Sequence, residues 1–476
     1  MLPFLHFEST PMKKKNTFTR RTFLHQLATS SLLLLPEQAQ ATPAAPAQSS
    51  IPFLKGINAY YLLVEAYRYV KQNAARGKRR ELVYEYLTRQ LQLPDIQEEC
   101  GFNAIRFWAF NDYPDMEGIA LPGATDARLW LGKDKAEPEA FEILAHLFEF
   151  LEHFGLYMVP CLANYWSSYG GILQYLAWAG TINEETYINA VCENKTDELY
   201  LHNTLRFFTS AEVENIFRKH TGRVISLLAG ARSVAIIDIM NEPRGKNPYS
   251  LKDKALPDGR KSSEIVAQWF NRQARWARSF FKFPGQQPFF STGEDGWLEQ
   301  PVNYKPCTYL CKQGQYYEGI DLTKNLSFQP PGINIGSIHL YPHRIAQLQE
   351  TNICGRSFID RRGWEHLMPA TFQHDKKQFA ALSMEWIRTR AAVLKGKPWY
   401  IGEMGWCWPV SSDRKPASAQ TLAKERHYLY TRWTDQAKKL GARGVFLWML
   451  NGHDHRDAFY GLNRRELFSV ITGRNL

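Results

Sequence analysis

Eight short runs rich in β-branched and aromatic residues alternate with helical patterns along the chain, and this alternation limits the fold more than any other feature. The runs have the length and composition of buried strands, and they cover residues 53–59, 104–110, 157–164, 234–241, 288–293, 334–341, 399–404 and 444–450. Apolar residues spaced three and four apart predict helices at residues 81–100, 138–154, 211–229, 263–281, 376–394 and 419–440. The pattern predicts an α/β fold, a (β/α)8 TIM barrel with long insertions in its βα loops.

A doubly wound sheet is the alternative arrangement of alternating strands and helices. Such a sheet would be expected to have a glycine-rich phosphate loop after its first strand, and Gly56-Ile-Asn-Ala-Tyr-Tyr61 is not such a loop. Three connections are long, at residues 165–210, 297–333 and 342–375. Each follows a strand, so each is expected on the carboxyl face of the barrel, where such barrels carry their chemistry. Long aromatic insertions there would form a cleft for an extended ligand.

The composition is that of an ordinary soluble domain, with one exception. Hydrophobic residues make up 44% of the chain and charged residues 22%, but aromatic residues reach 14%, with 14 Trp. Aromatic faces either stack on flat ligands such as sugar rings or fill a core. The net charge is +11, and the densest basic cluster is Arg76-Gly-Lys-Arg-Arg80. No nucleic-acid motif accompanies that cluster, so we interpret it as a solvated helix end and expect no nucleic-acid partner.

Seven cysteines rule out a framework fully paired within one chain. Cys307 and Cys311 are close enough in sequence for a local disulfide in an oxidising compartment. Cys161 is expected as a buried thiol. Too few further ligands lie near the cysteines for a metal site, and we expect neither a metal nor a cofactor.

The N-terminus reads as a targeting segment. Thr19-Arg-Arg-Thr-Phe-Leu24 precedes an apolar stretch that includes Ser31-Leu-Leu-Leu-Leu35, and Ala39-Gln-Ala41 is a small-residue cleavage site. The segment resembles a twin-arginine signal, with Met1 or Met12 as the start. We expect a signal peptide at 1–41, a flexible leader at 42–50 and one domain at 51–476. The apolar stretch is too short for a membrane anchor. The resemblance implies the twin-arginine export machinery as a partner and a periplasmic or secreted protein.

Two glutamates stand at the ends of strand-like runs. Glu242 lies in Val234-Ala-Ile-Ile-Asp-Ile-Met-Asn-Glu-Pro-Arg244, and Glu403 lies in Lys397-Pro-Trp-Tyr-Ile-Gly-Glu-Met-Gly405. A buried strand does not otherwise favour a charge. Two carboxylates at one barrel mouth would suit acid–base and nucleophilic chemistry on a glycosidic bond.

All eight predicted strands end in a polar or aromatic group. The candidates, in chain order, are Asn58, Tyr60, Tyr61, Arg106, Trp108, Asn164, Trp166, Asn241, Glu242, Glu294, His339, Tyr341, Glu403 and Trp448. One such residue is usually structural, but such residues at every strand end indicate a functional face.

These segments together resemble family 5 of the glycoside hydrolases, specifically its endo-β-1,4-mannanase branch. The resemblance runs in order over about residues 53–450 and rests on Gly56–Leu62, Gly101-Phe-Asn-Ala-Ile-Arg-Phe-Trp-Ala-Phe-Asn-Asp112, Asn164-Tyr-Trp-Ser-Ser-Tyr-Gly-Gly171, Met240-Asn-Glu-Pro-Arg244, Gly336-Ser-Ile-His-Leu-Tyr-Pro342, Lys397–Gly405 and Gly444–Leu450. Asn-Glu-Pro alone marks a wider group of retaining enzymes, whereas the combination points to mannanases.

The resemblance implies roles for the paired glutamates. Glu242 matches the acid/base, whose pKa should be raised towards neutrality. Glu403 matches the nucleophile, which must stay ionised, and Arg106 is the candidate cation beside it. In a retaining enzyme the two carboxyl groups lie about 5–5.5 Å apart.

The resemblance also implies a set of substrate-binding residues. Asn241 should bond the sugar 2-hydroxyl, and Tyr341 should steady the nucleophile. His339, Trp166 and Trp448 should line subsites, with Trp448 as the platform under the sugar at the cleavage point. Arg106, Trp108 and Asn164 complete the expected set, and Glu294 falls where related enzymes often place another polar residue.

Departures from the branch concern the subsites. Tyr165 replaces the more usual Asn of Asn-Asn-Trp, and Met404 stands where Phe or Tyr is common. The stretch Asn451-Gly-His-Asp-His-Arg-Asp457 is rich in His and acids, which suits a solvated loop or a distal subsite, with metal binding as the alternative.

The sequence therefore predicts retaining, endo-acting hydrolysis of β-1,4 bonds in mannan, glucomannan or galactomannan. Alternatives within the family are a β-1,4-glucanase and an exo-acting β-mannosidase, since long loops could close one end of the cleft. An alternative from another class is a carbohydrate-binding barrel without turnover.

Overall fold

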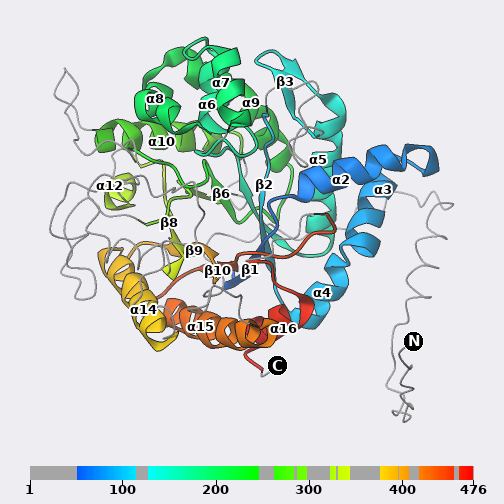
Figure 1. Cartoon of the computed structure of the whole chain (residues 1–476), viewed down its shortest axis with the longest axis vertical. Helices are drawn as coiled ribbons and strands as arrows, with labels where there is room; N and C mark the ends of the chain where they lie inside the picture. The colour runs from blue at the N-terminus through cyan, green and yellow to red at the C-terminus, as the bar shows by residue number, and fades with distance from the viewer. Residues whose placement is uncertain are drawn as a thin grey trace. The chain divides into compact units, whose positions relative to one another are not determined.

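Eight parallel strands form the centre of the domain in the computed structural model (Figure 1). The structure describes residues 51–113, 127–193, 195–245, 262–282, 287–296, 322–327, 331–342, 376–394, 396–406, 418–454 and 460–474. In chain order the strands are β1 (Leu54–Asn58), β2 (Ala104–Trp108), β5 (Tyr157–Cys161), β6 (Ile236–Asp238), β7 (Phe289–Ser291), β8 (Gly336–Leu340), β9 (Trp399–Met404) and β10 (Gly444–Leu447).

The strand order shows a closed barrel. The sheet runs β7-β6-β5-β2-β1-β10-β9-β8, so the first and last strands of the chain pair with each other. Single hydrogen bonds join the two remaining edges: Asn334 N–H donates to Phe290 O at 3.1 Å, and His339 N–H donates to Asp295 O at 3.1 Å. The predicted TIM barrel is confirmed, and each predicted strand is present in an equal or shorter form.

The barrel has two separate apolar cores because alternate strand residues face opposite ways. The lumen is filled by a small cluster made of Leu54, Ala104, Val159, Ala235, Ile236, Phe289, Ile335, Tyr400 and Phe446. A much larger cluster fills the space between strands and helices. Gly56 lets the Phe446 ring cross the lumen, since a Cβ at Gly56 would lie 2.1 Å from a ring carbon.

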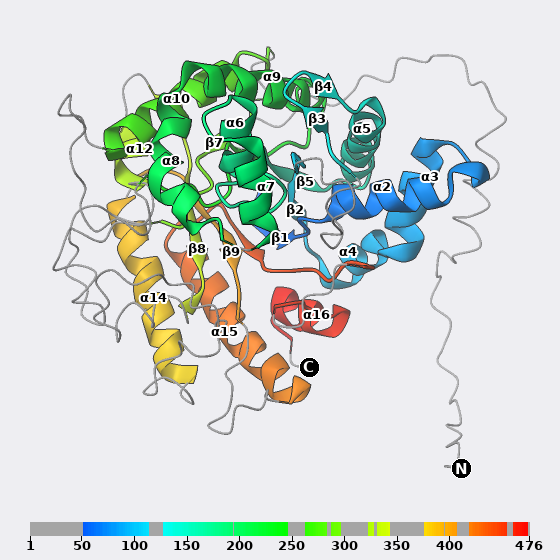
Figure 2. The same ribbon diagram turned by 45° about the horizontal axis from the view of Figure 1, so that its top comes forward.

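Helices surround the strands, as Figures 1 and 2 show. Outside residues 165–210, the main helices are α2 (Leu62–Gln72), α3 (Arg79–Glu85), α4 (Leu93–Cys100), α5 (Pro138–His153), α9 (Ala211–Leu228), α10 (Ser262–Arg278), α14 (Lys376–Val393), α15 (Ala419–Lys439) and α16 (Arg464–Thr472). Five of the six predicted helices are confirmed within a few residues. The C-terminal α16 packs on α4 and α15 and so links the two ends of the helical ring.

The predicted helix at 81–100 is wrong as a single element. It breaks into α3, a π-helical turn η4 (Tyr86–Gln90) and α4. Gln92 has a left-handed φ of 53°, and α4 has a proline in its first turn. Pro94 has no N–H to donate to a helix that continues from η4, which explains why a new helix starts at Leu93.

The connection at 165–210 is a helical insertion. It contains α6 (Gly171–Trp178), α7 (Glu184–Cys192) and α8 (Asp197–Thr209), and α8 packs against α6, α9 and α10. Asn183 caps α7 by accepting from Thr186 N–H at 3.0 Å, and Ser210 caps α9 by accepting from Val213 N–H at 3.3 Å.

Four small elements complete the described structure. They are η3 (Ala74–Arg76), the hairpin of β3 (Trp130–Gly132) and β4 (Lys135–Ala136), and α12 (Leu322–Ser327). The basic cluster at 76–80 lies at η3 and the start of α3, where its exposed arginines pair with Glu85, Glu139 and Glu149.

Some predictions lie outside the described residues. These are the signal peptide and leader within 1–50, the pair Cys307 and Cys311, and most of the connections at 297–333 and 342–375. Cys161 is a buried thiol, as predicted, and burial raises its pKa. Among the helices of the described ranges, none is both long and apolar enough to cross a membrane.

Candidate active site

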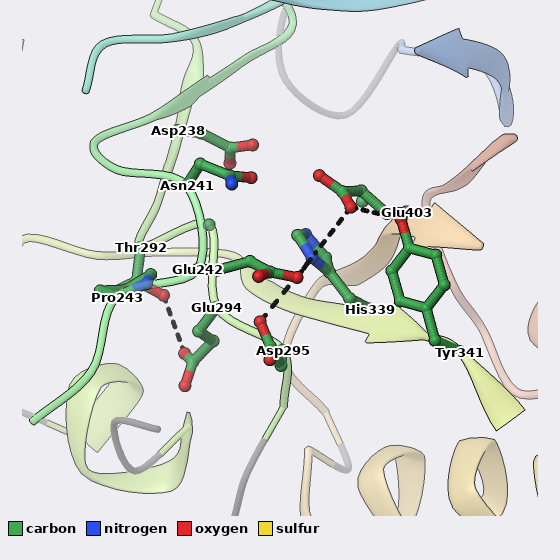
Figure 3. Close-up of polar contacts among 12 residues, drawn as sticks. Asp238, Asn241, Glu242, Pro243, Thr292, Glu294, Asp295, His339, Tyr341 and Glu403 are labelled. Carbon is green, nitrogen blue, oxygen red and sulfur yellow. Dashed lines mark hydrogen bonds and ion pairs between the residues drawn. The ribbon is translucent and has the colours of Figure 1, made fainter. Parts of the chain in front are cut away.

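Two buried glutamates meet at the carboxyl end of the barrel (Figure 3). Glu242 follows β6, and Glu403 lies near the end of β9. One carboxylate oxygen of each lies within 4.8 Å of the other. Retaining glycosidases hold their two carboxyl groups about 5–5.5 Å apart, whereas inverting ones keep them about 6.5–9.5 Å apart to leave room for the attacking water.

A β-bulge at Gly402 directs Glu403 into the barrel. Strand β8 pairs Ile338 with Ile401 and His339 with Glu403, so β9 has one extra residue at this point. Strand β10 on the other side shows the same shift, with Val445 opposite Ile401 and Leu447 opposite Met404. Tyr400 faces the lumen, and strict alternation would turn Glu403 away from it. The bulge changes this spacing, and bulges next to functional sites commonly re-aim a side chain in this way.

Arg106 lies under the glutamate pair and is fully buried. Its guanidinium donates to four side chains at 2.7–3.1 Å: Asp238 Oδ2, Asn58 Oδ1, Glu403 Oε1 and Asn241 Oδ1. Asp238 also accepts from the hydroxyl of Tyr400. A buried arginine needs such partners to offset the loss of water around its charge.

Glu403 is held by hydrogen bonds to both oxygens. Oε1 accepts from Arg106 Nη1 at 2.7 Å, and Oε2 accepts from the Tyr341 hydroxyl at 2.6 Å. Burial raises the pKa of Glu403, and His339, Arg106 and the Tyr341 hydrogen bond oppose that rise without cancelling it. The carboxylate is thus fixed in place.

Glu242 has an unusual backbone that directs its side chain. Its φ is +44°, a left-handed value rare outside glycine, and it precedes Pro243. Glu242 N–H donates to Gly293 O at 2.9 Å, which ties the turn to the loop after β7. Its Oε2 accepts from the indole N–H of Trp166 at 2.8 Å, and its Oε1 lies 3.1 Å from Nδ1 of His339.

His339 faces three acids through one nitrogen. Nδ1 lies 3.1 Å from Glu242, 3.5 Å from Glu403 and 3.7 Å from Asp295. Burial alone would lower the pKa of His339, but Glu403 and Glu242 together raise it above its ordinary value. Nε2 is buried and has no hydrogen-bond partner among the described residues.

The same cluster is the one group of acids and histidines in the described part of the chain that is close enough to hold a metal. Arg106 already supplies a buried positive charge 2.7 Å from Glu403, and His339 Nδ1 is engaged with Glu242. This arrangement favours acid–base chemistry over a metal centre.

Two charged residues of the site were not singled out in the sequence. Arg244 donates to Asp295 Oδ2 at 2.7 Å, lies 3.8 Å from Glu242 Oε2 and stacks over the Trp166 ring. The predicted polar residue, Glu294, accepts instead from the Thr292 hydroxyl at 2.8 Å (Figure 3). Arg244 belongs to the Asn-Glu-Pro-Arg motif and Asp295 directly follows Glu294, so both positions had a signal nearby.

Three of the predicted aromatic residues, Tyr60, Trp108 and Trp448, pack together in an aromatic wall. Trp448 and Tyr60 are half-buried and stack with ring centroids 5.5 Å apart. Trp108 is mostly buried behind them, against Tyr60 and Tyr169. Half-exposed parallel rings are suited to contact a sugar face.

Asn164 and Asn241 are hydrogen-bonded to each other. Asn241 donates to Asn164 Oδ1 at 3.2 Å and accepts from Arg106. Asn164 is buried, and its side chain also binds Trp166 N–H and Ser168 O. Asn164 therefore holds Asn241 and the backbone of Trp166 through these hydrogen bonds.

The loop after β10 is anchored by a buried carboxylate that the sequence did not reveal. Glu65 on α2 accepts from the backbone N–H of His453 at 2.9 Å and of Asp454 at 3.0 Å, and from the Tyr86 hydroxyl at 2.6 Å. The His453 and Asp454 side chains are about half exposed, as expected for a solvated loop. Residues 455–457 lie outside the described part.

A (β/α)8 barrel with two adjacent buried glutamates at its carboxyl end is the architecture of glycoside hydrolases that use a carboxylate pair. The chain belongs to the glycoside hydrolase family 5 beta-mannosidase-like group, whose family model matches residues 48–302.

Known proteins similar to this chain carry related names. It is 26% identical over 302 residues to mannan endo-1,4-beta-mannosidase 4 of Oryza sativa subsp. japonica, covering 61% of this chain and 51% of the relative. It is 23% identical over 270 residues to the probable mannan endo-1,4-beta-mannosidase A-2 of Aspergillus terreus, covering 56% and 55%. The chain thus spans little more than half the length of these relatives.

Solved structures show the same fold. The hyperthermostable endo-1,4-beta-D-mannanase of Thermotoga petrophila RKU-1 matches with a TM-score of 0.54 at 17% identity, covering 88% of this chain and 98% of that chain. The endo-1,4-beta-mannanase of Rhizomucor miehei matches with a TM-score of 0.55 at 14% identity, covering 89% and 93%.

Proposed function

We propose that the protein is a retaining, endo-acting glycoside hydrolase that cleaves β-1,4-mannosidic bonds in mannan, glucomannan or galactomannan. The observation that carries the proposal is the approach of Glu242 and Glu403 to within 4.8 Å, with Arg106 on one of them. This separation suits a double displacement through a glycosyl-enzyme. The family membership and the names of the relatives support the choice of mannan.

In the first step Glu403 attacks the anomeric carbon while Glu242 donates its proton to the glycosidic oxygen. The bond to the leaving sugar breaks, and the glycosyl unit becomes an ester of Glu403. In the second step a water molecule gives a proton to Glu242 and attacks the same carbon, which releases Glu403. Two inversions give net retention.

The surrounding residues have supporting roles in this proposal. Arg106 and Tyr341 keep Glu403 oriented and offset the cost of its buried charge. Asn241, fixed by Arg106 and Asn164, is suited to bond the sugar 2-hydroxyl. Trp448, with Tyr60 beside it, is suited to support the sugar ring at the cleavage point. His339 and Trp166 line the site through their contacts with Glu242.

The test is reducing-sugar release by the mature protein from linear β-mannan, konjac glucomannan and carboxymethyl cellulose, with product lengths resolved. Mixed manno-oligosaccharides from mannan are the expected result. Mannose alone would indicate an exo-acting enzyme, and activity confined to cellulose would make the protein a glucanase. Sugar binding without turnover on any of them would indicate a carbohydrate-binding barrel.

We also propose that residues 1–41 are a twin-arginine signal peptide and that residues 51–476 form one exported catalytic domain after a leader at 42–50. The support is the order Thr19-Arg-Arg-Thr-Phe-Leu24, apolar stretch and Ala39-Gln-Ala41. Removal of 1–41 takes away five basic and two acidic residues, so the net charge falls from +11 to +8. Changing Arg20 and Arg21 to lysine should retain the protein in the cytoplasm of an expressing bacterium. Unchanged export in cell fractionation would contradict the assignment.

A further inference from the structure

Trp166 contacts the acid/base carboxylate directly rather than only lining a subsite. Its indole N–H donates to Glu242 Oε2 at 2.8 Å, and its ring is half-buried. Trp166 follows β5, and its backbone N–H donates to Asn164 Oδ1 at 3.3 Å. The sequence predicted Trp166 to line the cleft, but the hydrogen bond from its indole nitrogen to Glu242 is seen only in the structure.

The indole is held in this position by the helical insertion. Tyr165 and Tyr200 pack edge-to-face on Trp166, with ring centroids 5.0 and 6.0 Å away. Tyr200 lies on α8, and the Tyr165 hydroxyl is 2.9 Å from the Thr204 hydroxyl on the same helix. The Arg244 guanidinium stacks on the Trp166 ring, 5.2 Å from its centroid. The direction of the N–H is therefore determined by packing.

The chemistry of the two partners distinguishes the two oxygens of Glu242. Indole N–H is a donor with no acceptor capacity, whereas a histidine nitrogen can donate or accept. In a protonated carboxyl group the carbonyl oxygen is the better acceptor, so the indole favours Oε2 as the carbonyl oxygen. Arg244 Nη2, 3.8 Å from Oε2, adds positive charge on the same side. Oε1 lies 3.1 Å from His339 Nδ1, which can accept a hydrogen bond when the imidazole is neutral, so Oε1 is the oxygen that can then carry the proton.

We propose that Trp166 is a positioning residue for general-acid catalysis: its N–H holds Oε2 of Glu242 as the unprotonated oxygen and assigns the transferable proton to Oε1. This inference rests on the proposed function. When the leaving sugar departs, Glu242 gives up that proton to the glycosidic oxygen, and the indole hydrogen bond then stabilises the carboxylate that forms. His339 on the other oxygen can accept or donate as the charge changes.

The charged groups around Glu242 come from two loops and two strands. His339 lies on β8, Glu403 on β9, Asp295 after β7 and Arg244 after β6. Asp295 pairs with Arg244 at 2.7 Å, which tempers the effect of Arg244 on Glu242. Removing the indole N–H leaves these charges in place, so its effect on the carboxyl group can be measured separately.

The test is Trp166→Phe, which keeps an aromatic ring but removes the N–H. The substrates are mannopentaose, whose leaving sugar needs a proton, and 2,4-dinitrophenyl β-mannobioside, whose leaving group does not. We expect kcat/KM to fall about 10- to 100-fold on mannopentaose and less than about 3-fold on the dinitrophenyl substrate. The alkaline limb of the pH profile should move up by about one pH unit, because the carboxylate loses a stabilising donor.

Trp276→Phe on α10 is the matched control, because the same substitution is then made away from the site, and it should change neither substrate's kcat/KM. Equal losses on both substrates, with the alkaline limb unmoved, would overturn the inference and leave Trp166 as a sugar platform only. If the unmodified protein cleaves neither substrate, the proposed function itself fails. The two failures are thus distinguishable.

Discussion

Gly402→Ala should reduce turnover while leaving the fold and sugar binding nearly intact. A Cβ at Gly402 would lie 3.0 Å from His339 Nε2 and 3.1 Å from Ser337 Oγ, closer than side chains normally pack. The backbone there has no left-handed φ, so the change introduces crowding without backbone strain. His339 would be pushed from its Nε2 side, by a few tenths of an ångström, towards the glutamates.

The size of the effect follows from what that shift disturbs. His339 Nδ1 is 3.1 Å from Glu242 and 3.5 Å from Glu403, so a small movement misaligns a hydrogen bond to a charged group. Such a bond contributes about 1.5–3 kcal/mol, which corresponds to a loss in kcat of about 10- to 100-fold. Overpacking should lower the free energy of unfolding by about 1–3 kcal/mol. The KM should change less than about 3-fold, since the aromatic wall is untouched.

The assay is steady-state hydrolysis of mannopentaose together with urea unfolding. Gly132→Ala is the matched control, because its Cβ would meet nothing within 4 Å, and it should change neither quantity. Adding Ser337→Ala to Gly402→Ala relieves one of the two close contacts, so it should restore part of the stability but little of kcat. A folded Gly402→Ala protein with kcat within about 2-fold of the original would refute the reasoning.

Further predictions concern the carboxylates and their partners. Glu242→Ala should lower kcat/KM on mannan about 10²- to 10⁴-fold, and azide should restore turnover of the dinitrophenyl substrate with β-mannosyl azide as product; no azide adduct would contradict the acid/base role. Arg106→Lys should lower the free energy of unfolding by about 3–5 kcal/mol and kcat by at least about 100-fold, because one ammonium cannot serve four acceptors. Unchanged stability in urea unfolding together with near-normal kinetics would decide against this prediction. Since burial raises the pKa of Glu403 and the nucleophile must be ionised, the acidic limb of kcat/KM should lie above the ordinary glutamate range of about 4.3. Tyr341→Phe removes a donor to that carboxylate, so the limb should move to still higher pH, and a shift to lower pH would be inconsistent with this contact.

The barrel was predictable because its strands are short, mostly apolar runs and its helices have periodic apolar residues. The prediction of one helix at 81–100 was wrong because the apolar spacing continues across the segment, whereas Pro94 interrupts the helix. The helices α6, α7 and α8 were missed because the segment at 165–210 begins with Gly and aromatic residues of a loop. In the structure α6 and α8 pack against α9, and α7 packs on α6, and these tertiary contacts are not contained in a local pattern.

The site was predictable as a set of residues but not as a set of contacts. Glu242, Glu403 and Arg106 come together as expected from the ends of parallel strands. The bulge at Gly402 could not be foreseen, because a register shift is a property of the neighbouring strands as much as of β9. Whether Glu294 or Asp295 contacts the site depends on the turn after β7. That turn directs Glu294 towards Thr292 and Asp295 towards Arg244.

Arg106 joins parts of the barrel that are far apart in the chain. It extends from β2 and binds Asn58 on β1, Asp238 on β6 and Glu403 on β9. A fragment ending after β7 would contain Arg106 and Glu242 but no nucleophile, and the complementary fragment would contain Glu403 without its cation. Under the proposed mechanism neither piece could turn over substrate, and activity would return only when both reassemble with their strands in register. Turnover would therefore serve as a direct reporter of fragment complementation.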